Sequence, residues 1–377
     1  MFARAFSTKP LHSVAVGFAN HGAPDSVLSI SRISVSPPSP SQVTLKFLAS
    51  PINPADINQI QGTYPVLPQF HKNISTDHDQ FAIGGNEGVA EIVALGHEVA
   101  NKRDWLKVGS RVVMRNAGFG TWRQFANAQV SEIIPLNYPG VSLHAAATLM
   151  VNPCTAYRML SDFAPLGQND VVIQNGANSA VGQAVIQIAR SQNIKTINMI
   201  RGTLDGKTPR PGLQELKEKL ASMGADLVVT EEEMRSREAL AKILALGNGQ
   251  GPKLGFNCVG GKSATNLARV LAPGASLITY GGMSKEPVSI PTGLLIFKDL
   301  QFRGFWMTRW NESCAKDALL ETERENMLKQ LSRLVSSGKL AVPDVDIVSV
   351  KGIEDLETVK NSFAKAMGGG SSKKQLL

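Results

Sequence analysis

The stretch DVVIQNGANSAVGQAVIQIARSQNIKTINMIRG, residues 170–202, decides the fold of this chain. Its β-branched run at 171–173 is typical of a buried strand, and apolar residues recur with helical spacing over 181–189. A second apolar strand follows at 196–200. A strand, a tight turn of small residues, a helix and another strand together predict the βαβ unit of a parallel sheet.

The same alternation continues downstream of this unit. We expect a helix at 213–224, a strand at 226–230, a helix through Leu240, and strands at 253–261 and 275–283 that end in glycine. Strands that alternate with helices predict an α/β fold with a doubly wound parallel sheet.

Upstream, from Ser13 to about Pro139, the pattern is different. Short β-like runs such as 42–50, 88–96 and 110–116 are broken by Pro, Gly and Asn. This texture predicts a mainly β domain with many loops. At 377 residues the chain exceeds the usual size of a single core, so two domains are expected, with a change of texture near residue 150.

The composition is that of an ordinary globular protein, with 43% hydrophobic residues and a mean hydropathy of -0.05. No apolar run approaches the roughly 20 residues that span a bilayer, so no membrane span is expected. A net charge of +8 favours acidic partners such as phosphates, an acidic carrier protein or nucleic acid, and also fits a mitochondrial matrix enzyme.

The cysteines and the N-terminus bear on the compartment. Cys154, Cys258 and Cys314 are odd in number and widely spaced, which fits neither a disulfide framework nor a zinc knuckle and indicates a reducing compartment. Residues 1–24 are basic, rich in small hydroxyl side chains and free of acidic residues. They are typical of the remnant of a mitochondrial transit peptide, and a short basic leader without significance is the alternative.

The turn NGANSAVG, residues 175–182, is a candidate dinucleotide site. Small residues there let a pyrophosphate approach backbone N–H groups at a helix N-terminus. The turn departs from G-x-G-x-x-G, because Ala177 and Ser179 occupy the first two glycine positions and only Gly182 keeps the third. An ordinary βαβ turn is the alternative interpretation.

Arg201 points to the phosphorylated form of the cofactor. An NAD site usually carries a carboxylate at the end of the second strand, whereas here that strand ends in Arg201 and no carboxylate appears before Asp205. A guanidinium pairs with a 2′-phosphate in a bidentate manner, so we expect NADPH, with Lys207 and Arg210 as further candidates. An exposed arginine that caps a strand is the alternative.

The stretch GGNEGVAEIVALGHE, residues 84–98, raises the question of a metal site. Catalytic zinc needs three ligands from Cys, His or carboxylate side chains. No second histidine follows His97–Glu98 at helical spacing, so this pair is interpreted as a solvated turn. Glu87 and Glu91 would share one face of a strand without a histidine or cysteine, and no metal is predicted. A further segment, GGGSSKK (368–374), is interpreted as a flexible tail.

Two of these stretches resemble a known superfamily. INPADINQIQGTYP (52–65) and GGNEGVAEIVALG (84–96) are similar to the medium-chain dehydrogenase/reductase superfamily. Zinc-dependent members carry Gly-His-Glu where this chain has Gly85–Asn86–Glu87, so the resemblance implies a zinc-free branch. It also implies a GroES-like mainly β catalytic domain (1–150 and 313–377) and a Rossmann cofactor domain (151–312).

Three further motifs narrow the resemblance. MVNPCTAYRML (150–160), YGGM (280–283) and FRGFWMTRW (302–310) resemble the mitochondrial enoyl thioester reductases, over nearly the whole chain from about Ala15 to Lys374. The resemblance implies NADPH-dependent reduction of trans-2-enoyl thioesters in mitochondrial fatty acid synthesis, in the matrix. It also implies a homodimer formed by the cofactor-domain sheets.

The resemblance assigns roles residue by residue. It makes Tyr64 the catalytic tyrosine and places Asn152 at the nicotinamide half of the cofactor. The pyrophosphate would be held by Asn178, Ser179, Ala180 and Val181, and the 2′-phosphate by Arg201, Gly202 and Thr203. The nicotinamide and acyl pocket would be lined by Tyr280, Gly281, Gly282, Met283, Phe305, Trp306 and Met307. Lys374 would lie near the cofactor.

Tyr64 has a second interpretation, which is packing beside Pro65 and Pro68. Tyrosine suits an acid role because its free pKa is about 10, so it keeps its proton at neutral pH. Asn53 and Asp56 are interpreted as loop-fixing caps, and a direct role for Asp56 stays open.

Two other functions are considered. A quinone reductase of the same zinc-free branch would share the Rossmann half. A cofactor-binding crystallin-like or RNA-binding protein would fit the basic charge, but the chain has no RNA-recognition signature and no nucleic acid is expected. The charge can instead serve an acidic acyl carrier protein, for which Lys262, Lys298 and Arg309 are candidate contacts.

Overall fold

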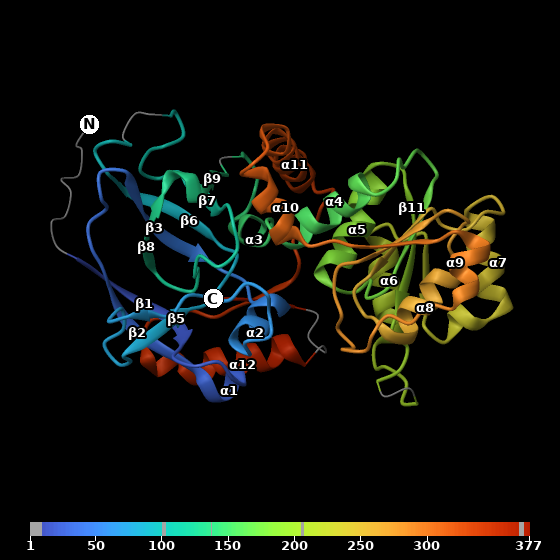
Figure 1. The fold of residues 1–377 in the computed structure, drawn as a ribbon, viewed down its shortest axis with the longest axis horizontal. Coiled ribbons are helices and arrows are strands. Elements are labelled where there is room, and N and C mark those ends of the chain that lie inside the picture. Colours follow the sequence, from blue (N-terminus) through green and yellow to red (C-terminus); the bar gives the residue numbers. More distant parts are fainter. Residues whose placement is uncertain (1–9, 100–102, 137, 205–206, 369–372) are drawn as a thin grey trace. The chain divides into compact units, whose positions relative to one another are not determined.

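The computed structural model describes residues 10–99, 103–136, 138–204, 207–368 and 373–377. The chain divides into two compact units, each of which is described by itself (Figure 1). Unit 1 comprises Met1–Met150, Asn311–Lys316 and Val342–Leu377, and unit 2 comprises Val151–Trp310 and Asp317–Ala341. The predicted α/β fold, with a mainly β part and a parallel-sheet part, is confirmed.

Unit 1 contains two antiparallel sheets. The first has the order β2–β1–β5–β4, with β1 (Leu11–Phe18), β2 (Leu28–Val35), β4 (His71–Lys72) and β5 (Gln80–Ile83). The second has the order β8–β3–β6–β7–β9, with β3 (Gln42–Ala49), β6 (Val89–Leu95), β7 (Arg111–Met114), β8 (Phe125–Gln129) and β9 (Ile133–Pro135). Three of the predicted strands, at 42–50, 88–96 and 110–116, therefore lie side by side in the second sheet.

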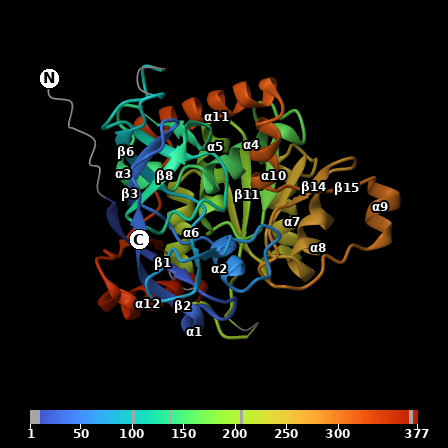
Figure 2. The same cartoon turned by 60° about the vertical axis from the view of Figure 1, so that its left-hand side comes forward.

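The helices of unit 1 are short apart from the last. They are α1 (Pro24–Val27), α2 (Pro54–Ile60), α3 (Leu143–Ala147) and α12 (Leu356–Met367), with 3-10 turns at Val130–Glu132 and Ile353–Asp355. Helix α12 packs along α1 and β2 (Figures 1 and 2). Its Phe363 meets the Trp122 ring edge-on at 5.0 Å between centroids, which ties α12 to the core beneath the first sheet.

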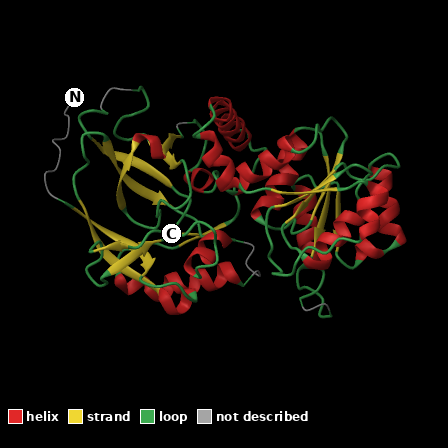
Figure 3. Cartoon of the chain, viewed as in Figure 1, coloured by secondary structure: helices red, strands yellow, loops and turns green. Residues whose placement is uncertain are grey.

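Unit 2 is built around one six-stranded parallel sheet. The order is β12–β11–β10–β13–β14–β15. The strands are β10 (Val171–Gln174), β11 (Lys195–Ile200), β12 (Leu227–Thr230), β13 (Leu254–Asn257), β14 (Ser276–Thr279) and β15 (Gln301–Gly304). Helices cover both faces (Figure 3), so central strands such as β10 are buried throughout. The strand order reverses between β10 and β13, and such sheets bind ligands at the point where the order reverses.

The helices of unit 2 include the one predicted within the βαβ unit at 170–202. They are α4 (Asn152–Asp162), α5 (Ala180–Ser191), α6 (Leu213–Ser222), α7 (Arg237–Leu246), α8 (Gly261–Val270), α9 (Thr292–Lys298), α10 (Met307–Cys314), which crosses the division, and α11 (Ala318–Ser336), with a 3-10 turn at Glu233–Arg235. Helix α7 ends at Leu246 rather than at the predicted Leu240, because Ile243 is also buried in the core.

Two expectations concern the chain ends. Residues 1–9 of the predicted leader lie outside the described residues, but Leu11–Phe18 forms β1, so this part of the 1–24 stretch belongs to the fold. The prediction that 368–374 is a flexible tail is wrong at its end. Residues 369–372 lie outside the described part, whereas Lys374–Leu376 forms β17, which pairs with β16 (Val345–Ile347) in a parallel register.

The division into units differs from the expected domain limits in one segment. Helix α11 belongs to unit 2, where it packs on α4 and buries Leu328 and Leu331, although 313–377 was expected to return to the β domain as one piece. The expected limits stay a prediction. Within the described residues, none of the helices is both long and apolar enough to cross a membrane.

Candidate active site

Helix α2 presents a row of buried polar side chains in unit 1. Asn53 precedes the helix, and Pro54 is its first residue, where the fixed φ angle of proline favours the helical conformation. The Asn53 N–H donates to Asp56 Oδ2 at 2.7 Å. Residues three apart share a helix face, so Asn53, Asp56 and Gln59 all point inward. Each is at most 2% exposed.

Asn86 lies at the centre of the hydrogen bonds that this row makes. Its Nδ2 donates to Asp56 Oδ1 and to Gln59 Oε1, both at 2.6 Å. Its Oδ1 accepts from Gln59 Nε2 at 3.1 Å and from the Gly118 N–H at 2.7 Å. An amide has two donors and two acceptor lone pairs, so all four are in use.

The row continues into charged groups. Asn53 Nδ2 donates to Glu87 Oε2 at 3.0 Å, and Lys374 Nζ donates to Asn53 Oδ1 at 2.5 Å. The C-terminal strand holds Lys374 there, since the Ile52 N–H donates to Gln375 O at 3.0 Å. We call Asn53, Asp56, Gln59, Asn86, Glu87 and Lys374 the α2 cluster.

Burial sets the electrostatics of the α2 cluster. Desolvation raises the pKa of Asp56 to about 6, against the opposing effect of the Asn53 N–H, Lys374 and Asn86. Desolvation lowers the pKa of Lys374, against the attraction of Glu87 and Asp56. Two carboxylates and one ammonium thus meet in a nearly closed network, in which Lys374 offsets part of the negative charge.

The α2 cluster does not fit a zinc ion. The amide of Asn86, at the position where the resemblance implies a histidine in zinc-dependent members, is fully used in hydrogen bonds. His97 and Glu98 lie exposed in the turn after β6, as expected for a solvated turn. Glu87 and Glu91 do not act as a pair: Glu87 accepts from Asn53, and Glu91 lies opposite Lys46 and Arg111 in the sheet register.

Tyr64 lies half-buried in the turn that follows α2. This turn is attached to the helix, because the Gly62 N–H donates to Gln59 O at 3.1 Å and Gln59 Nε2 donates to Val66 O at 2.9 Å. The α2 cluster therefore reaches the tyrosine turn directly. Pro65 is exposed and Pro68 is buried.

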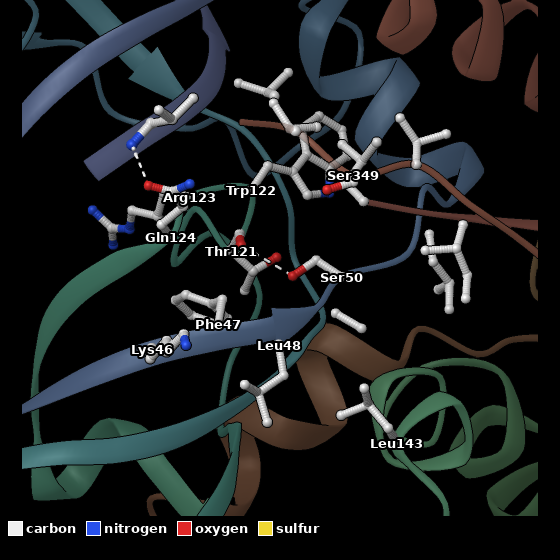
Figure 4. Close-up of a pocket in the computed structure, with 18 of the residues that line it drawn as sticks. Lys46, Phe47, Leu48, Ser50, Thr121, Trp122, Arg123, Gln124, Leu143 and Ser349 are labelled. Atoms are coloured by element: carbon white, nitrogen blue, oxygen red, sulfur yellow. Dashed lines mark hydrogen bonds between the residues drawn. The ribbon is translucent and has the colours of Figure 1, made fainter. Parts of the chain in front are cut away.

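Unit 1 also contains a pocket of about 480 Å³ (Figure 4). Its walls are mostly apolar and include Phe47, Leu48 and Trp122. Ser50 Oγ donates to Thr121 O at 3.0 Å on its wall, and Thr121 Oγ1 donates to Glu87 O at 2.7 Å. No pattern in the sequence indicated this cavity.

In unit 2, the backbone of the turn between β10 and α5 is tightly packed and leaves room for small side chains only. Gly176 has φ +58, and a Cβ on Gly182 would come within 2.6 Å of Ala177 O. Ser179 Oγ accepts from the Gly182 N–H at 3.1 Å and caps the helix. The left-handed residue is thus Gly176, which explains why alanine is tolerated at 177.

The predicted pyrophosphate residues lie together at this helix start. Asn178, Ser179 and Ala180 are half-buried and Val181 is buried, all at the first turn of α5. Backbone N–H groups at a helix N-terminus attract anions. The turn therefore fits a dinucleotide phosphate.

Arg201 follows β11 and is exposed, and among the described residues it makes no ion pair. Gly202 is buried, and a Cβ there would approach Glu232 Oε2 to 2.6 Å. Thr203 Oγ1 donates to Glu232 Oε1 at 3.1 Å. The Arg201 side chain is therefore accessible, and the Glu232 carboxylate is hydrogen-bonded to Thr203.

Buried polar groups link neighbouring strands at the carboxyl edge of the sheet, and the sequence analysis did not predict them. Asn175 Nδ2 donates to Asn257 Oδ1 at 2.7 Å, and the Cys258 N–H donates to Asn175 Oδ1 at 2.8 Å. Tyr280 follows β14, and burial together with Cys258 raises its pKa well above the usual value, with Ser179 opposing. The signal in the sequence was an asparagine at or just after the end of each of two β-like runs.

The other predicted residues of unit 2 extend this edge. Gly281, Gly282 and Met283 follow Tyr280, and the Met283 N–H donates to Cys258 O at 2.9 Å. Phe305, Trp306 and Met307 follow β15, and Asn152 begins α4. The Phe305 ring meets that of Phe163 edge-on at 5.9 Å. Tyr64 and Lys374 belong to unit 1, so the structure groups the predicted residues into two sets.

Comparison with known proteins supplies the family. Residues 39–139 match the alcohol dehydrogenase GroES-like domain, and residues 180–322 match the zinc-binding dehydrogenase family. The mitochondrial enoyl-[acyl-carrier-protein] reductase of Rattus norvegicus is 45% identical over 342 residues, which cover 90% of this chain and 83% of that protein. The chain belongs to this family.

Solved structures agree with this assignment. A complex of Etr1p with NADP and crotonyl-CoA has a TM-score of 0.86 and 35% identity, over 97% of this chain and 99% of that one. The mitochondrial 2-enoyl thioester reductase Etr1p/Etr2p heterodimer from Candida tropicalis gives 0.85 and 35% over the same shares. At the level of the family, these relatives confirm the predicted oxidoreductase reaction, the NADP cofactor and the mitochondrial location.

Proposed function

We propose that this chain reduces trans-2-enoyl thioesters to saturated acyl thioesters with NADPH in mitochondria. The observation that carries the proposal is Asn86, whose amide is fully hydrogen-bonded where zinc members have a ligand. Polarisation of the substrate then falls to a neutral donor, and Tyr64 lies in the turn that the same cluster holds.

The reaction needs a donor at the thioester oxygen. Reduction adds a hydride to Cβ and a proton to Cα, and negative charge develops on the thioester oxygen between these events. When bound, NADPH supplies the hydride. In this proposal the Tyr64 hydroxyl donates a hydrogen bond to that oxygen, since a phenol keeps its proton at neutral pH. Its proton then passes to Cα, and solvent water returns a proton to the phenolate.

The cofactor-binding roles in this proposal are those that the family resemblance implies, and most of the residues lie at the carboxyl edge of the unit 2 sheet. The first turn of α5, residues 178–181, holds the pyrophosphate through backbone N–H groups. Arg201 pairs with the 2′-phosphate, with Gly202 and Thr203 beside it. Residues 280–283 and 305–307 line the nicotinamide and acyl pocket, with Asn152 at the nicotinamide and Lys374 near the cofactor.

A purified sample supplied with NADPH and a trans-2-enoyl-CoA tests this function. We expect NADPH consumption together with formation of the saturated acyl-CoA, and little turnover with NADH. Faster turnover of a quinone than of the enoyl thioester would instead support the quinone reductase of the zinc-free branch. Salt-dependent retention of RNA that NADPH does not displace would support the non-enzymatic alternative.

The chain also acts as a homodimer in this proposal. Strand β15 is the edge of the unit 2 sheet, and Leu295, Ile296 and Phe297 of neighbouring α9 are exposed, Phe297 at 84%. An exposed apolar group at a sheet edge is typical of a subunit interface. Light scattering of Phe297→Glu should show a monomer, whereas Leu319→Glu on α11 should leave the dimer intact. A dimeric Phe297→Glu would contradict this arrangement.

An acyl carrier protein is the second proposed partner. Lys262 and Arg309 are exposed and can meet acidic side chains of such a carrier. Lys298 is a weaker candidate, because its Nζ donates to Arg269 O and Leu271 O, both at 2.8 Å. Charge reversal at Lys262 and Arg309 should raise KM for an acyl-carrier substrate and leave KM for the CoA thioester unchanged. Equal effects on both substrates would argue against carrier docking.

A further inference from the structure

The turn that carries Tyr64 is held at both ends by one residue. On its first side, the Gly62 N–H donates to the backbone oxygen of Gln59 at 3.1 Å. On its far side, the side-chain Nε2 of Gln59 donates to Val66 O at 2.9 Å. Tyr64 lies between these two attachment points, so the position of Gln59 limits where the tyrosine backbone can go.

Asn86 fixes the side chain of Gln59. The two amides bond reciprocally, with Asn86 Nδ2 to Gln59 Oε1 at 2.6 Å and Gln59 Nε2 to Asn86 Oδ1 at 3.1 Å. Because Asn86 also donates to Asp56 and accepts from the Gly118 N–H, its own amide has one orientation. Gln59 is therefore held with its Nε2 toward Val66.

The Val66 end of the Tyr64 turn also lies close to a partner of Asn86. Gly118, which donates to Asn86 Oδ1 at 2.7 Å, lies close to the Val66 side chain, since a Cβ built on Gly118 would lie 3.8 Å from Val66 Cγ1. Gln59 itself is 2% exposed, and its amide pair with Asn86 is buried, so water does not compete for those two hydrogen bonds. The bond to Val66 O is part-buried, at the edge of the cluster.

We propose that Gln59 is a positioning residue for Tyr64, acting through the amide pair with Asn86 and the bond to the Val66 carbonyl. The inference rests on the proposed role of Tyr64. A donor on a turn must sit within hydrogen-bond reach of an oxygen whose charge develops only during reaction, and a small misplacement weakens that bond. Asn86 in this position orients the donor instead of binding a metal.

Gln59→Met tests the proposal, because methionine keeps the length of the side chain and loses its hydrogen bonds. We expect kcat with a trans-2-enoyl-CoA to fall about 10- to 100-fold, with the NADPH dissociation constant unchanged within about twofold. Gln61→Met is the matched control, since Gln61 lies on the same helix end and its side chain is outside the α2 cluster. It should keep nearly the wild-type rate.

A double-mutant cycle separates positioning from general damage. If Gln59 acts through Tyr64, Gln59→Met should cost almost nothing further in a Tyr64→Phe background. Multiplicative losses in the double variant, or a wild-type rate in Gln59→Met, would overturn the inference while leaving Tyr64 in place. A wild-type rate in Tyr64→Phe would overturn the proposed role of Tyr64 itself, and the inference with it.

Gln59→Glu decides the matter should the methionine variant fail to fold. A protonated carboxylic acid at this position can still donate to Val66 O, whereas the carboxylate cannot. Asp56, Glu87 and Lys374 lie in the same cluster in both proteins, so the ratio of the variant rate to the wild-type rate at each pH is compared. This ratio should be low at alkaline pH and rise as the pH falls and the introduced carboxylate takes up its proton. A pH profile parallel to that of wild type would contradict the inference.

Discussion

The two candidate sites, the α2 cluster of unit 1 and the carboxyl edge of the unit 2 sheet, bury polar groups in opposite ways. In unit 1 the α2 cluster contains three charged groups, Asp56, Glu87 and Lys374, linked through Asn53. In unit 2 the buried groups at the carboxyl edge of the sheet are neutral, such as Asn175 and Asn257, which hydrogen-bond one another at 2.7 Å. Arg201, which follows β11 at that edge, is exposed.

This difference indicates different tasks. The α2 cluster is closed, with the side-chain amides of Asn53, Gln59 and Asn86 hydrogen-bonded within the protein before any substrate arrives, which suits a site that must hold a donor in place. The edge of the unit 2 sheet is open, with backbone N–H groups and a guanidinium that await negative charge from a ligand. Four variants can break or sharpen this contrast.

The largest effect is expected at the open site, from Gly182→Val. A Cβ at this position would lie within 2.7 Å of the backbone of Ala177 and of Gly176 O, neither of which can move freely. We expect a loss of about 3 kcal/mol in the free energy of unfolding and a large loss of NADPH affinity in fluorescence titration. Gly167→Ala, where the nearest group is Asp170 Oδ2 at 3.7 Å, is the control. Wild-type stability and NADPH affinity in Gly182→Val would contradict the conclusion that this turn has no room for a side chain at 182.

The closed site predicts an unusual pH dependence. Burial raises the pKa of Asp56 from the ordinary value of 3.8 to about 6 in the folded protein. The contribution of this group to stability is therefore fully present below pH 4 and is lost as the pH rises through 6, by roughly 2–3 kcal/mol. The stability of wild type minus that of Asp56→Asn, from urea unfolding at pH 4 to 7, should fall over this range. Asp104→Asn, at an exposed site, should show no such trend, and a difference that rises with pH would contradict the burial argument.

Arg201→Leu should have a smaller effect that is confined to the cofactor. Loss of a charge-assisted contact to the 2′-phosphate should raise KM for NADPH about tenfold, which is about 1.4 kcal/mol. KM for NADH should hardly change. Arg237→Leu removes the same charge from exposed α7 and should leave both values unchanged. Equal losses for NADPH and NADH would show that Arg201 does not read the phosphate.

The smallest effect is expected at the histidine that the sequence first put forward as a ligand. His97 lies exposed in a turn, and the amide of Asn86 has no unused donor or acceptor for a metal. Turnover by His97→Ala, and by wild type after dialysis against a chelator, should stay within about twofold of the untreated enzyme. Loss on chelation with recovery on added Zn²⁺ would show that the α2 cluster is not closed to metals.

The sequence predicted the parts of this molecule that depend on local pattern. Residues 170–202 have the periodicity of strand, turn and helix, and the structure pairs Ile173 with Ile197 in a parallel register. The small residues of 175–182 and the arginine after β11 were likewise visible as a short motif. Such features lie within one stretch of chain, so spacing alone is enough to indicate them.

Features that depend on distant pairing were not predictable in this way. Lys374 follows a glycine-rich run that suggested a flexible tail, yet β17 is fixed by β16 and by residues 50–52. The bonds that join Gln59 to Asn86 and Asn175 to Asn257 link residues far apart in sequence. Gly176 was overlooked as the left-handed residue because the motif placed the first glycine at 177.

Turnover by Tyr64→Phe gives the most direct test of a metal-free reductase that relies on a positioned phenol. At saturating NADPH and trans-2-enoyl-CoA, kcat should fall by about 10²- to 10⁴-fold, while the NADPH dissociation constant and the melting temperature match those of wild type. A kcat within twofold of wild type would contradict this role and move the donor to another group.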